Sequence, residues 1–185
     1  MTPADAETAL AGLGSDDLLL VQQEIPQAAT RRALELARAQ GVTSLLNTAP
    51  FLADTAALAP LASIVVANET EFALLSGRPV AELDAAMAQW AARHDQILIV
   101  TLGGDGVKAF AGGRLLSIPA LPIKPVDTVG AGDTFVGYLA AGLDAGLDLE
   151  TALRRAAAAG SLACLKPGAQ PAIPMAEEVD RAIEG

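Results

Sequence analysis

The sequence predicts an α/β fold built on a mostly parallel sheet with helices on both of its faces. Short apolar runs alternate along the chain with longer stretches in which apolar residues recur every three to four positions. The short runs contain few polar residues, which is typical of strands in a parallel sheet that is covered on both faces. Of the 185 residues, 52% are hydrophobic and 18% charged, which is enough apolar mass for one core. We therefore expect a single domain over residues 1–185.

Strands are expected where apolar and β-branched residues follow one another over four to six positions. The first such run, at 17–22, comes after a helix, and the runs at 43–46, 63–67 and 96–101 follow. Two further runs, at 107–111 and 114–118, flank Gly112-Gly113 and predict a β-hairpin.

Helices are expected where apolar residues fall on one face. The stretch 26–40 has this pattern, and Gly41 is suited to end the helix. The same criterion predicts later helices at 69–76, 82–94, 132–145, 149–165 and 175–183. This alternation of strand and helix indicates a series of βαβ units.

The composition excludes several classes of function. A formal net charge of −10 argues against nucleic acid as a partner, because phosphate backbones are bound by clustered Lys and Arg. The largely apolar run near the start, 18–23, is too short to span a bilayer, and residues 1–5 lack the basic, then apolar, pattern of a secretory signal. We expect a cytoplasmic protein with no membrane contact. The single cysteine, Cys164, excludes an internal disulfide.

The most informative segment is Val126–Phe135, which places glycines and then a carboxylate at the start of an apolar helix. Gly130 and Gly132 let the backbone turn so that N–H groups point outward at the helix N-terminus, where the dipole favours an anion. Asp133 would lie beside a bound phosphate and could accept a proton from an attacking hydroxyl. The alternative is a simple N-capping aspartate after a glycine turn.

The longer string D-T-V-G-A-G-D-T-F, at 127–135, resembles the second signature of the ribokinase-like sugar kinases, the PfkB family. Three other segments agree with it in order: Asn68–Glu71 resembles the N-x-x-E motif, 101–106 the T-L-G-x-x-G loop, and 166–171 the K-G-A-Q-P tail. The resemblance runs from about Leu18 to the C-terminus. It implies a three-layer, ribokinase-like sandwich.

The family places its sugar pocket, its lid and a first Gly-Gly signature in an N-terminal part that has no counterpart here. The resemblance therefore implies that N-terminal strands and the lid are missing. We expect an uncovered sheet edge and self-association into a homo-oligomer such as a dimer. We also expect the isolated 185-residue chain to be inactive, because the sugar and the terminal phosphate would not be held in line.

The resemblance assigns the chemical roles. Asp133 is the base and meets the sugar hydroxyl, while backbone N–H groups of Gly130, Ala131 and Gly132 form the anion hole. Asn68 and Glu71 act on magnesium and phosphate, largely through water. The predicted nucleotide loop is Thr101, Leu102, Gly103, Gly104, Asp105 and Gly106.

The resemblance also implies a potassium site and contacts to the adenine and the sugar. Asp127 and the carbonyl of Val129 would hold the cation, and oxygen-only ligation suits such a hard ion. Ala172 stands where ribokinases often have Ser, Ala157 offers no polar group near the adenine, and Glu24 matches an acidic residue near the sugar or is merely solvated. The further cation ligands are carbonyls of Ala163, Lys166 and Gly168.

The expected function is transfer of the γ-phosphate of ATP to a sugar hydroxyl, with ATP, Mg²⁺ and K⁺ as cofactors. Ribose is favoured because of the 166–171 tail, Glu24, and Asn47-Thr48-Ala49-Pro50, which resembles the family's N-P-A-P. Fructose, 2-keto-3-deoxygluconate and nucleosides stay open as acceptors. A noncatalytic nucleotide-binding or interaction module is the alternative from another class.

Overall fold

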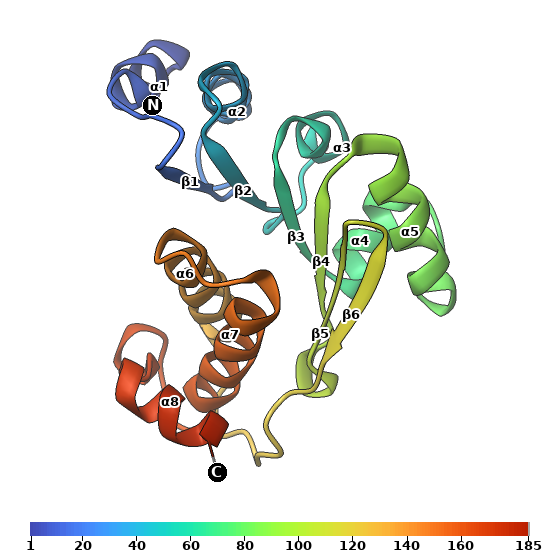
Figure 1. The fold of residues 1–185 in the computed structure, drawn as a ribbon, viewed down its shortest axis with the longest axis vertical. Helices are drawn as coiled ribbons and strands as arrows, with labels where there is room; N and C mark the ends of the chain where they lie inside the picture. The colour runs from blue at the N-terminus through green and yellow to red at the C-terminus, as the bar shows by residue number, and fades with distance from the viewer. Residues whose placement is uncertain (185) are drawn as a thin grey trace. The chain divides into compact units, whose positions relative to one another are not determined.

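The structure is a computed structural model of the chain and describes residues 1–184. Its sheet has six strands that follow one another in chain order across the sheet (Figure 1). The strands are β1 (Leu18–Val21), β2 (Thr43–Asn47), β3 (Ile64–Asn68), β4 (Ile97–Thr101), β5 (Val107–Ala111) and β6 (Arg114–Ile118).

Eight α-helices occur within residues 1–184. They are α1 (Pro3–Leu10), α2 (Gln27–Gln40), α3 (Thr55–Leu58), α4 (Glu69–Ser76), α5 (Leu83–His94), α6 (Ala131–Asp144), α7 (Leu149–Ala163) and α8 (Ala176–Glu184). Short 3-10 turns lie at Ala59–Leu61, Val80–Glu82, Gly103–Asp105 and Gln170–Ala172. None of these helices is long and apolar enough to cross a bilayer.

The chain forms two compact units. The first comprises Met1–Thr101 with Ala109–Leu115, and the second comprises Leu102–Lys108 with the chain from Leu116 onward. The expectation that residues 1–185 make a single domain stays a prediction.

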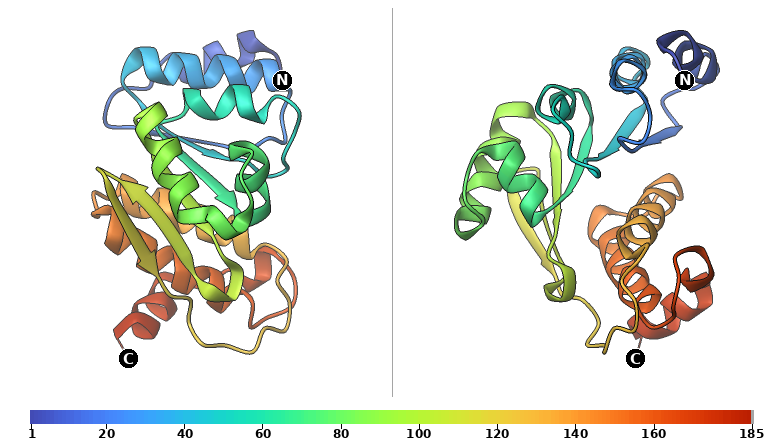
Figure 2. Two further views of the ribbon diagram at one scale, coloured as in Figure 1. Left: turned by 90° about the vertical axis from the view of Figure 1, so that its right-hand side faces the viewer. Right: turned by 180° about the vertical axis from the view of Figure 1, so that it is seen from behind.

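Parallel pairing builds the first unit. The four strands β1 to β4 pair in parallel, with Leu20 opposite Leu45, Leu45 opposite Ile64, and Ile64 opposite Ile97. Each crossover adds the next strand on the same side, and since such crossovers are as a rule right-handed, the connecting helices fall on one face. Figures 1 and 2 show α2, α4 and α5 along that face. Strand β1 forms one edge of the sheet, where Leu20 is 38% exposed.

Helices α1 and α2 form a small core of their own beside β1. Thr2 and Asp5 make a capping box that starts α1, with Pro3 as its first residue. The buried residues of this core are Ala6, Leu10, Ala33, Ala37 and Val42. Gly41, at φ 72°, ends α2, as the sequence predicts.

Small side chains let α6 and α7 pack closely in the second unit. A Cβ atom added to Gly142 would lie 3.2 Å from the Cβ of Ala152, and one added to Gly160 would lie 3.3 Å from the Ala131 carbonyl oxygen. Helix α8 closes this unit by burying Val179 against Ala158 and Ala159 of α7. The alanine-rich sequence of α7 therefore reflects close helix packing.

Every strand and helix expected by residue range is present, with ends displaced by no more than two residues. The expected fold class, α/β with a mostly parallel sheet, is confirmed. Helix α6 begins at Ala131 and not at 132, because Gly130 caps it in the left-handed conformation with φ 76°. The four-residue helix α3 was missed, since a single turn has no periodicity to detect.

Candidate functional site

The N-terminus of α6 has the geometry that the glycine motif predicts. Gly130 turns the chain, and Asp133 lies in the first turn of the helix, where it is exposed. The Thr134 hydroxyl donates to the Gly130 carbonyl oxygen at 2.9 Å, and this bond stabilises the first turn of the helix. Of the three N–H groups in the predicted anion hole, that of Ala131 donates to Thr128 O over 3.3 Å, a long bond. A charged acceptor could replace so weak a partner.

Gly130 is also required by packing. A Cβ atom at this position would lie 2.9 Å from the Cβ and 3.1 Å from the Cα of Ala169. Ala169 belongs to the 166–171 tail, so two of the motifs identified in the sequence contact each other in the second unit. Gly132, by contrast, has nothing within 4 Å of an added Cβ.

The predicted nucleotide loop is a tight turn. The amides of Asp105 and Gly106 donate to Leu102 O and Gly103 O, and Leu102 N donates to Gly106 O at 2.8 Å. Gly103, Gly104 and Asp105 are exposed, whereas Gly106 is buried with φ 101°. A Cβ atom on Gly106 would overlap the Ile118 carbonyl oxygen and lie 2.6 Å from Ala120 N. Packing therefore requires glycine at position 106, and Gly103, Gly104 and Asp105 are the exposed residues of the segment.

Asp127 joins the glycine turn to the 166–171 tail. Its Oδ2 accepts from Gly168 N at 2.8 Å and its Oδ1 accepts from Val129 N at 3.0 Å. The Gly168 amide, and after it the Val129 amide, lower the pKa of Asp127 from its ordinary value of 3.8. The carboxylate is therefore held ionised, which suits a cation ligand. Ala163, whose carbonyl was also predicted as a ligand, and Ala172, which stands where ribokinases often have Ser, are buried residues of the same unit.

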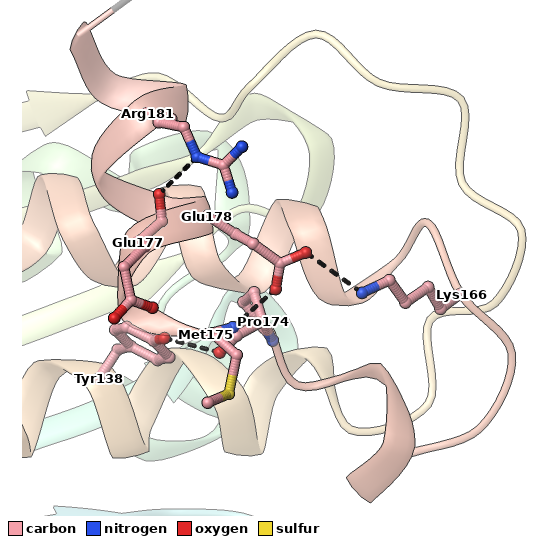
Figure 3. Close-up of polar contacts among 7 residues, drawn as sticks. All are labelled: Tyr138, Lys166, Pro174, Met175, Glu177, Glu178 and Arg181. Carbon is pink, nitrogen blue, oxygen red and sulfur yellow. Dashed lines mark hydrogen bonds and ion pairs between the residues drawn. The ribbon is translucent and has the colours of Figure 1, made fainter.

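Lys166 is the first residue of the 166–171 tail, and its side chain contacts α8. Its Nζ is 3.4 Å from Glu178 Oε1, and Glu178 Oε2 accepts from Met175 N at 2.8 Å (Figure 3). Tyr138 of α6 donates to Pro174 O at 2.7 Å beside them. These contacts tie the tail to α8, and they leave the main-chain carbonyl of Lys166 as its predicted contribution to the cation site.

The N-x-x-E motif forms a capping box at the start of α4. Asn68 Oδ1 accepts from Glu71 N at 2.8 Å, and Glu71 Oε2 accepts from Asn68 N at 3.0 Å. Thr101, at the end of β4, is the sheet partner of Asn68 in the first unit. Glu24 is exposed after β1. Ala157, in the middle of α7, is a buried residue of the second unit and offers no polar side chain, as its sequence predicts.

The sequence did not predict a third residue that contacts this capping box. Thr48 donates its hydroxyl proton to Glu71 Oε2 at 2.9 Å. The two residues are 23 positions apart, so no local sequence pattern predicts the contact. The only sequence signal is a Thr at the second position of a segment that resembles N-P-A-P.

A family model described as "pfkB family carbohydrate kinase" matches residues 6–176. The chain belongs to this family. The pfkB match begins earlier than Leu18, where the motifs alone had placed the start of the resemblance, because α1 and its junction to β1 carry no motif.

Relatives of this pfkB chain include two curated ribokinases. That of Bacillus subtilis (strain 168) is 35% identical over 183 residues, which cover 99% of this chain and 60% of the relative. That of Staphylococcus aureus (strain COL) is 37% identical over 186 residues, which cover 98% of this chain and 61% of the relative. The chain thus spans about three-fifths of the length of these proteins.

Comparison with solved structures also identifies a ribokinase as similar to this chain. The structure of Arabidopsis thaliana ribokinase complexed with ribose and ATP matches with a TM-score of 0.85 at 28% identity, covering 100% of this chain and 60% of that chain. The expected ribokinase-like fold is therefore confirmed for the pfkB chain described here.

The donors present are compatible with the metals that were predicted. Within residues 1–184, no three His, Cys, Asp or Glu side chains come together as a metal cluster. A magnesium ion keeps most of its water and needs only one or two protein carboxylates. Glu71 can supply one, and Asp127 with main-chain carbonyls can supply oxygen ligands to a monovalent cation.

Proposed function

We propose that the chain is the nucleotide-binding and catalytic portion of an ATP-dependent sugar kinase that favours ribose. The observation that carries this proposal is the N-terminus of α6 in a pfkB chain, with Gly130 in the left-handed conformation and Asp133 in the first helical turn. This arrangement places backbone N–H groups and a carboxylate at the same end of α6, where an anion can bind.

In the proposed reaction, the Asp133 carboxylate accepts the proton of the sugar hydroxyl as its oxygen attacks the γ-phosphorus. The bond to the β–γ bridging oxygen breaks, and ADP leaves with the electron pair. The N–H groups of Gly130, Ala131 and Gly132 donate to the phosphoryl oxygens where negative charge gathers. Bound magnesium would neutralise charge on the phosphates, with Asn68 and Glu71 holding it through water.

The nucleotide would lie along the 101–106 segment, close to Ala157. The proposed potassium site comprises Asp127 and carbonyls of Val129, Ala163, Lys166 and Gly168, with Ala172 in place of a hydroxyl ligand. It is supported by the ionised state of Asp127 and its bond to Gly168. Activity should therefore rise with potassium, and Asp127→Ala should flatten that response. Contact of Glu24 with the sugar and homodimerisation also remain proposals.

The deciding experiment compares two substitutions on one helix in the intact protein that carries this sequence. Asp133→Asn should lower ribose-dependent turnover by about 10²- to 10⁴-fold with little change in ATP affinity. Asp144→Asn, at the exposed C-terminal end of α6, is the matched control and should leave turnover unchanged.

ADP release is measured with ribose, fructose, 2-keto-3-deoxygluconate and a nucleoside as acceptors. Near-normal turnover of Asp133→Asn would remove Asp133 from the role of base. ATP binding without transfer to any sugar would favour the noncatalytic alternative.

A further inference from the structure

We propose that Thr48 is a positioning residue that holds the Glu71 carboxylate for its contact with the metal–nucleotide complex. This inference rests on the proposed kinase function and assigns a role to a residue outside its motifs. Thr48 directly follows β2 and has a relative exposure of 0%.

The Glu71 carboxylate receives two hydrogen bonds on one oxygen. Oε2 accepts from the Thr48 hydroxyl at 2.9 Å and from Asn68 N at 3.0 Å. Within residues 1–184, no hydrogen bond to Oε1 occurs. The two donors therefore fix the orientation of the carboxylate while leaving its second oxygen for water or metal.

Thr48 is itself held from two sides. Its N–H donates to Val66 O at 2.9 Å, and its carbonyl oxygen accepts from Gln23 Nε2 at 3.1 Å. Gln23 is also buried and donates to Thr55 Oγ1 at 2.6 Å. This network links Thr48 to β3 and to Gln23 beyond β1, so several hydrogen bonds of the first unit hold the residue that orients Glu71.

The residue type at this position is decisive. The segment Asn47–Pro50 resembles N-P-A-P, in which the second position is a proline. A proline has neither an N–H group nor a hydroxyl, so it could donate neither to Val66 O nor to Glu71. The threonine adds both bonds, which makes Glu71 in this chain more firmly oriented than a capping box alone would make it.

The test uses three variants of the intact protein. Thr48→Val removes the hydroxyl and keeps the shape, and Thr48→Ser restores a hydroxyl. Thr30→Val is the matched control, because Thr30 is equally buried and its hydroxyl has no hydrogen-bond partner among the residues described. If Thr48→Val does not fold, Thr48→Ala replaces it, since Ala and Ser at this position also differ by one hydroxyl.

Two measurements are made on each variant. Affinity for Mn²⁺ in the presence of a nonhydrolysable ATP analogue is followed by electron paramagnetic resonance, and amide hydrogen exchange of Asn68 is followed by NMR without ligand. Thr48→Val should weaken Mn²⁺ binding about 10-fold, as loss of a residue that orients a metal ligand does. It should also speed exchange of the Asn68 amide, which shares Oε2. Thr48→Ser should restore both values, and Thr30→Val should change neither.

Wild-type values for Thr48→Val in both measurements would overturn the proposal. Weakening that Thr48→Ser fails to restore would also overturn it, because shape and not the hydroxyl would then matter. A wild-type protein that binds no Mn²⁺ nucleotide would refute the kinase proposal and with it the metal role of Thr48. A wild-type protein that binds it, with an unaffected variant, would refute the role of Thr48 alone.

Discussion

Replacing Gly130 by alanine should destabilise the second unit far more than the same change at Gly132. The two glycines are two positions apart in one motif, but their backbones differ. Gly130 has φ 76°, whereas Gly132 is an ordinary helical residue of α6. Alanine at Gly130 must therefore adopt a conformation that L-residues disfavour.

The cost at Gly130 has two parts. The left-handed conformation costs an alanine roughly 1–2 kcal/mol. The added methyl group would also lie 2.9 Å from the Cβ and 3.1 Å from the Cα of Ala169, so the tail must move. Overpacking of this kind costs about 1–3 kcal/mol, which gives a total of roughly 2–5 kcal/mol. At Gly132 the methyl group meets nothing within 4 Å, and alanine favours a helix by up to about 1 kcal/mol.

Thermal unfolding followed by circular dichroism distinguishes the two variants. In a protein of this size about 1 kcal/mol corresponds to roughly 2–4 °C, so Gly130→Ala should lower the unfolding temperature by about 4–20 °C. Gly132→Ala should leave it unchanged or raise it slightly. Equal destabilisation of both variants would refute the assignment of the left-handed turn and its contact with Ala169 to Gly130.

Three further predictions concern other residues. The pKa of Asp127 is lowered in the folded state, so its bonds to Gly168 and Val129 stabilise the fold above about pH 3.8 and are lost as the pH falls through the lower folded value. The Gly168 amide shift should report this titration in an NMR pH series, and a midpoint at or above 3.8 would contradict it. Thr30→Val should stabilise the protein by about 1 kcal/mol in urea unfolding, because the buried Thr30 hydroxyl has no hydrogen-bond partner among residues 1–184; a loss of stability would count against this reasoning. Gly106→Ala should prevent stable folding, since its Cβ would overlap backbone at Ile118, while Gly104→Ala should fold normally. Soluble, cooperatively unfolding Gly106→Ala protein would show that the 118–120 backbone can move aside.

Much of the fold could be predicted because its signals are local. Runs of apolar residues mark β2, β3 and β4, and glycines at positions 41 and 112–113 mark where a helix and a hairpin turn. The start of α4 was equally visible, because Asn and Glu three residues apart are the signature of a capping box. These features depend on neighbours within a few positions.

The features that were missed depend on residues far apart in the chain. The Thr48 hydroxyl reaches Glu71 only because β2 and β3 lie side by side. The burial of Gly106 against the backbone at 118–120 likewise requires the hairpin to be in place. The sequence identified both glycine motifs, but only the structure separates a glycine that the fold requires from one that is open to a ligand.

The order of the strands has a consequence for how the protein folds during its synthesis on the ribosome. Each strand of the sheet pairs only with strands adjacent to it in the chain, so every pairing can form once the next βα segment has been made. No pairing within the sheet has to wait for a strand that lies further along the chain than its next neighbour. At about 5–20 residues per second, synthesis of residues 1–101 takes on the order of 5–20 s, far longer than a helix or hairpin needs to form. The first unit can therefore grow strand by strand from β1 to β4, while α6 and Asp133 are still to be synthesised.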